Sequence, residues 1–164
     1  MQQGILSAAG LVFAAALVGA AASDLRAFRI PDRFALVLLA AFVPAAWAAG
    51  LPWATAFVHL GVALGIFAVS AGLFALGVWG GGDAKLLPAA ALWIGLAALP
   101  RFLLVMAVAG GLLAVLLLVF RRLPLPAGSW LGRTAATGHV PYGVAIAAAG
   151  LDWWAATLLP RLVG

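Results

Sequence analysis

The chain has 164 residues, of which 67% are hydrophobic and only 8% are charged. Soluble domains have about 25% charged residues, so this composition excludes water as the main solvent and indicates a membrane protein. The net charge of +5 comes from basic residues that stand singly between apolar runs, which argues against a nucleic-acid site. Because the chain has no cysteine, disulfides, thiolate metal sites and a cysteine nucleophile are excluded as well.

Six apolar runs bounded by charges or by Pro and Gly predict six transmembrane helices, because a helix needs about 17–25 apolar residues to cross a bilayer. These runs lie at 4–22, 34–50, 54–79, 86–99, 102–120 and 141–159. The fourth run is the weakest prediction, since it holds only roughly 14 residues. The sequence therefore predicts an all-α, polytopic membrane protein in which residues 1–164 form a single transmembrane domain.

The placement of Lys and Arg predicts the orientation of the helices, because basic residues favour the cytoplasmic side. If the first helix ends in the cytoplasm, that side holds most of the basic residues, namely Arg26, Arg29, Arg33, Lys85, Arg121, Arg122 and Arg133. The N-terminus is then expected outside. Residues 1–23 also resemble a secretory signal, but no basic residue precedes this run, so we favour a first span.

Two aspartates are the candidate reactive residues. Asp24 lies at the predicted cytoplasmic end of the first helix, and Asp83 follows Gly80-Gly81-Gly82 after the third helix. An acid at the end of a membrane helix is costly to bury, so each needs a partner or a function. The glycines permit a positive φ and the close approach of another backbone, which would let an extended substrate dock beside Asp83.

Plainer explanations exist for the polar residues of this region. Both aspartates could be solvated acids paired with nearby basic residues, and Lys85 could contact the substrate or simply anchor its helix. A phosphate-binding loop is not expected, because Leu86 rather than Ser or Thr follows Lys85. His59, inside the third predicted span, and His139 are expected to be structural, and we leave them out of the catalytic set.

Three motifs occur in order along the chain. They are Asp24 with Ile30-Pro31, the run Gly80-Gly81-Gly82-Asp83-Ala84-Lys85-Leu86, and the run Val140-Pro141-Tyr142-Gly143-Val144-Ala145-Ile146. Together they resemble the motifs of the type IV prepilin peptidases. The length and the predicted layout of spans are most similar to the short branch of that family, which serves tight-adherence (Flp) pili.

The resemblance implies an aspartyl endopeptidase of the bacterial inner (plasma) membrane that cleaves the short basic leader from prepilins at the cytoplasmic face. It assigns catalysis to Asp24 and Asp83. It also implies a set of residues that bind the substrate or shape the site, namely Gly80, Gly82, Lys85, Ile30 and Pro31. The expected partners are a prepilin and membrane lipid, and no metal or cofactor is needed.

Two departures from the family pattern change what is expected. Asp32 stands where the family usually has Asn after Ile-Pro, so the hydrogen bonds of that amide are not carried over. The chain also lacks the cysteine-bearing cytoplasmic insertion of the longer members, which is linked to N-methylation of the new pilin terminus. We therefore expect cleavage without methyl transfer.

Two other functions stay open at this point. The same aspartates could serve a small proton- or cation-coupled transporter or relay subunit, although both are expected at one membrane face rather than at the midplane. The chain could also be an assembly platform in a pilus or secretion machine, in which case the aspartates would tolerate replacement by amides.

Overall fold

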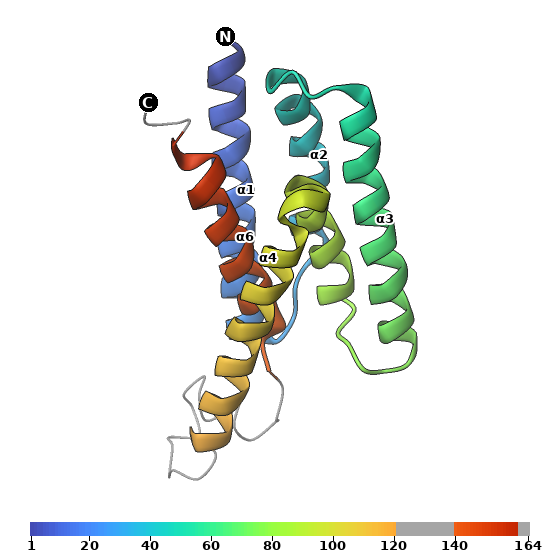
Figure 1. Cartoon of the computed structure of the whole chain (residues 1–164). Coiled ribbons are helices and arrows are strands. Elements are labelled where there is room, and N and C mark those ends of the chain that lie inside the picture. The colour runs from blue at the N-terminus through green and yellow to red at the C-terminus, as the bar shows by residue number, and fades with distance from the viewer. Residues whose placement is uncertain (121–139, 161–164) are drawn as a thin grey trace.

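The computed structural model describes residues 1–120 and 140–160, and every regular element in these two ranges is a helix (Figure 1). The elements are α1 (Gln2–Ala27), α2 (Asp32–Ala48), α3 (Trp53–Ala75), α4 (Asp83–Phe120) and α6 (Tyr142–Thr157). The expected all-α class is therefore confirmed.

Three of the described helices, α1, α3 and α4, are long and apolar enough to cross a membrane. The helices α2 and α6 are shorter, with 17 and 16 residues. These lengths and compositions support a membrane protein, whereas the six spans and the outside N-terminus stay predictions. Three of the basic residues on which the predicted orientation rests, Arg121, Arg122 and Arg133, lie outside the described residues.

The helix α4 is divided at Gly95, where φ is 68° and ψ is 176°. Figure 1 shows the chain changing direction between the two halves of α4. The sequence predicted this boundary at Pro100 and Arg101, which was wrong by about one turn. Pro100 lies inside the second half, five residues after the break, whereas only glycine adopts the backbone angles of residue 95 readily.

His59 of α3 fills the space beside this break. Its ring atom Nδ1 lies 2.7 Å from the carbonyl oxygen of Leu92, and because a carbonyl can only accept, Nδ1 carries the proton. A Cβ atom at Gly95 would lie 2.5 Å from the His59 ring. The structural role expected for His59 is thus confirmed, since the imidazole binds backbone of a neighbouring helix.

The first half of α4 occupies the centre of the protein. All of its residues from Ala84 to Gly95 are buried except Lys85. The indole of Trp93 packs against Phe13 of α1, with ring centroids 4.9 Å apart, and donates a hydrogen bond of 3.0 Å to the carbonyl oxygen of Leu38 in α2. This segment contains most of the short apolar run predicted at 86–99. Other helices rather than lipid surround much of it, so it does not need the full length of a transmembrane helix.

The ends of several helices meet at one end of the bundle. The helix α1 ends with Phe28 in a left-handed conformation (φ 50°), and its N–H group donates to the carbonyl oxygen of Asp24. Pro31 (φ −61°, ψ 142°) has an extended conformation and leads directly into α2. The beginnings of α4 and α6 lie beside this loop, as contacts of Gly82 and Gly143 with Ile30 show.

We predict that Gly95→Ala destabilises the protein, because the new methyl group would meet His59 and the residue would keep a positive φ. Such strain lowers the free energy of unfolding by about 1–3 kcal/mol. At about 2–4 °C per kcal/mol, the Tm should fall by several degrees. The measurement is thermal unfolding in detergent. Gly111→Ala in the same helix is the matched control, since nothing lies within 4 Å of its added Cβ atom. Equal Tm values for the two variants would contradict this account of the break.

Candidate functional site

The two predicted aspartates line the same cavity. Asp24 comes from the last turn of α1 and Asp83 from the first turn of α4. The cavity has a volume of about 190 Å³, and its other lining residues are Phe28, Arg29, Ile30, Gly80, Gly81 and Gly82. The fold therefore brings together two carboxyl groups that lie far apart in the sequence.

The carboxyl group of Asp24 is held by the beginning of α6. Asp24 is only 7% exposed, and its atom Oδ2 accepts a hydrogen bond of 2.8 Å from the backbone N–H group of Gly143. The first N–H groups of a helix are free to bind an acceptor, so the N-terminus of α6 is a suitable partner for a carboxylate. This contact fixes one side of the cavity.

Gly143 is a site residue that the sequence analysis did not single out. A Cβ atom there would lie 2.8 Å from Oδ2 of Asp24 and 2.7 Å from Cδ1 of Ile30, so no larger residue fits without displacing one of them. The sequence feature that could have identified Gly143 is its position directly after Pro141-Tyr142, at the start of a predicted helix. That position belonged to the third motif, but the motif alone does not say which side chain packs against it.

The carboxyl group of Asp83 has an unused acceptor. Among the described residues, no hydrogen-bond partner reaches its buried atom Oδ1. A buried polar atom without a partner is costly, so a proton donor supplied by water or by a ligand would be stabilised at this position. This oxygen therefore keeps its capacity to accept a hydrogen bond.

The glycines before Asp83 provide space rather than special backbone angles. None of the residues Gly80, Gly81 and Gly82 has a positive φ, so this part of the expectation was wrong. The expected close approach is confirmed. A Cβ atom at Gly82 would lie 2.8 Å from Cβ of Ile30 and 3.2 Å from its carbonyl oxygen, and one at Gly80 would lie 2.9 Å from Oδ2 of Asp83.

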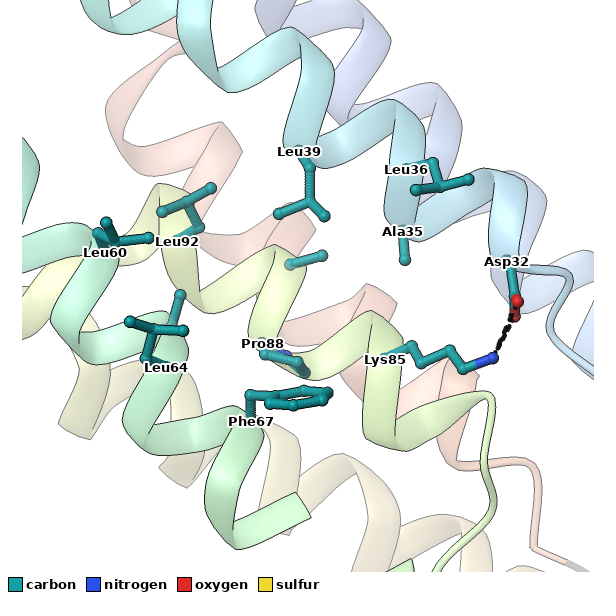
Figure 2. Close-up of a pocket in the computed structure, with 12 residues that line it drawn as sticks. Asp32, Ala35, Leu36, Leu39, Leu60, Leu64, Phe67, Lys85, Pro88 and Leu92 are labelled. Carbon is teal, nitrogen blue, oxygen red and sulfur yellow. Dashed lines mark hydrogen bonds and ion pairs between the residues drawn. The ribbon is translucent and has the colours of Figure 1, made fainter. Parts of the chain in front are cut away.

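Lys85 points away from the cavity and binds Asp32 at the start of α2. Its Nζ atom lies 2.8 Å from both carboxylate oxygens of Asp32. The dashed line in Figure 2 marks this ion pair. Lys85 and Pro31 do not line the aspartate cavity but lie in an adjacent opening, which Ile30 and Gly82 share with it. The structure thus groups the predicted site residues into two neighbouring recesses.

Other candidates lie elsewhere. Within residues 1–120 and 140–160, no three His, Cys, Asp or Glu side chains gather to form a metal site. Asp152 pairs with Arg101, at 3.0 Å, away from the two recesses. His139 lies outside the described residues, so its expected structural role stays a prediction.

Comparison with known proteins agrees with the resemblance of the motifs. The model of the type IV leader peptidase family matches residues 11–115, a segment that contains both aspartates and spans more than half of the chain. No curated protein and no solved structure gave a significant match. On the strength of the family match, the chain belongs to the type IV leader peptidase family and is a membrane-associated peptidase for pilin-like substrates.

Proposed function

We propose that this protein is an intramembrane aspartyl endopeptidase that removes the short basic leader from type IV or Flp prepilins at the cytoplasmic membrane face. Family membership supports a peptidase over a transporter or an assembly platform. The observation that carries the aspartyl class is the shared cavity of Asp24 and Asp83, whose other lining residues in the described part of the chain include no Ser, Thr, Cys or His. Residues 1–164 would act as one domain in the bacterial inner membrane, surrounded by lipid.

The pair of carboxyl groups can supply both an acid and a base. Two carboxylates in one largely buried cavity repel each other, so one proton is shared between them. The ionised group takes a proton from a water molecule as the water attacks the scissile carbonyl carbon. The protonated group donates a hydrogen bond to the carbonyl oxygen as negative charge develops there. Either aspartate can take either role, and no step requires a metal or a cofactor.

The walls of the cavity suit a peptide substrate. Gly80, Gly81 and Gly82 carry no side chain, so an extended backbone can approach Asp83 closely. The Oδ1 atom of Asp83 is buried and has no hydrogen-bond partner among the described residues, so a small rotation of the carboxyl group would let it accept from the substrate or from the attacking water. The acidic pair also complements a basic leader. Because the chain has no cysteine, and thus none of the insertion that bears one, the proposed reaction ends at cleavage without N-methylation.

We predict that Asp24→Asn and Asp83→Asn each abolish processing while the protein still accumulates in the membrane, because an amide cannot exchange the shared proton. The loss should be about 100-fold or more, which is the usual size of a general acid–base contribution. The measurement is the mass shift of a purified prepilin incubated with each variant. Asp152→Asn, a matched acid-to-amide change outside the cavity, should cleave at the wild-type rate. If either cavity variant retains a comparable rate, the aspartyl mechanism is wrong.

We also predict that Gly143→Ala slows cleavage by about tenfold or more, because a small displacement of a reacting group is enough to cost that much. The methyl group would displace either Asp24 or Ile30, and it would weaken the hydrogen bond that holds the carboxylate. Initial rates of prepilin cleavage are the measurement.

Gly65→Ala is the control, since nothing lies within 4 Å of its added Cβ atom. If Gly143→Ala and Gly65→Ala cleave equally fast, the hydrogen bond from Gly143 has no part in the reaction.

A further inference from the structure

A third recess lies between α2, α3 and the first half of α4, and it shares Asp32 and Lys85 with the opening beside the aspartate cavity (Figure 2). It is a groove with a volume of about 320 Å³, within the range of about 300–1,000 Å³ that is typical of ligand sites. Ten of its lining residues are apolar, and the two charged ones, Asp32 and Lys85, lie together at one end. The groove therefore has one polar end and a long apolar part.

The groove opens onto the outer surface of the helix bundle. Both α2 and α3 pack against α4 but hardly touch each other, so α4 forms the floor between two walls. Leu36 on the α2 wall is 62% exposed, and Leu64 on the α3 wall is 58% exposed. For a protein that lies in a membrane, lipid has direct access to this opening.

The length of the groove follows from the spacing of its residues. Asp32 and Leu39 are two turns apart on α2, as are Lys85 and Leu92 on α4, and two turns correspond to about 10 Å. Leu39 and Leu92 both line the groove away from the charged pair, as Figure 2 shows. The groove thus begins at charged residues at the helix ends and runs about 10 Å into apolar surroundings.

We infer that this groove binds a phospholipid with a zwitterionic headgroup, such as phosphatidylethanolamine. An acyl chain fills the apolar part, because unfilled space beside apolar side chains would forfeit dispersion contacts and the membrane offers no water to fill it. Lys85 receives the phosphate and Asp32 receives the ammonium group. An anionic headgroup would satisfy Lys85 but would also face the carboxylate of Asp32.

The ion pair between Lys85 and Asp32 is suited to such a ligand. Their side chains are 52% and 63% exposed, so each keeps an open face for a headgroup. Exposed ion pairs contribute little to stability, so the two side chains can move apart slightly without destabilising the fold. Since lipid tails are as apolar as the groove, preference between lipids comes from this charged end.

We test the lipid site by native mass spectrometry of the detergent-purified protein with phosphatidylethanolamine and phosphatidylglycerol that carry identical acyl chains. The wild type should retain phosphatidylethanolamine about tenfold more tightly, as expected for one added charged hydrogen bond. Asp32→Asn should remove this preference, because the amide no longer attracts the ammonium group. Equal retention of the two lipids by the wild type would overturn the assignment of the headgroup.

Filling the groove should expel the acyl chain. Leu64→Trp should lower retention of phosphatidylethanolamine about tenfold, whereas Val69→Trp, the same kind of change at an exposed position of α3 outside the groove, should not. Leu39→Trp on the opposite wall is a second test should Leu64→Trp fail to fold. If the folded groove variants retain lipid as Val69→Trp does, the lipid site is wrong, whatever happens to prepilin cleavage. A loss of cleavage with lipid retention unchanged would assign the groove to the substrate instead.

Discussion

The candidate site depends on the close approach of helix ends that only glycine permits. Gly82 lets the loop after α1 lie against the turn before α4, and Gly143 lets the start of α6 reach Asp24. Two segments that lie far apart in the sequence, residues 24–30 and 80–83, thereby line one small cavity. Because the two glycines lie this close to Ile30 and Asp24, the contacts leave little freedom for the carboxyl group of Asp24, and a reaction that needs a shared proton requires such restriction.

The central half of α4 gives this arrangement a rigid support. It is buried among the other helices, and Trp93 ties it to α2 through the carbonyl oxygen of Leu38. The break at Gly95 ends that half within the protein, where His59 binds the carbonyl oxygen of Leu92. Asp83 therefore stands at the beginning of a helix whose far end is also fixed.

Much of the fold could be predicted from the sequence, because apolar runs report directly on membrane helices. The boundary inside α4 was misplaced because a proline and an arginine are stronger local signs of a helix boundary than a lone glycine. The break occurs at Gly95, where the backbone lies against His59 of another helix, and a contact of this kind cannot be found from local sequence. The pair of aspartates could be predicted because each lies in a local motif. The sequence could not predict the hydrogen bond from Gly143 or the ion pair of Lys85 with Asp32, because each joins residues that only the folded chain brings together.

The partner of Asp24 also has a consequence for biosynthesis. Translation delivers α1 to the membrane first, but the N–H group that holds its carboxylate belongs to Gly143, which follows more than a hundred residues later. A nascent chain that has not reached α6 therefore contains both aspartates but lacks the N–H group that holds Asp24. The order of synthesis thus delays the contact that holds the carboxylate of Asp24 until α6 has been made.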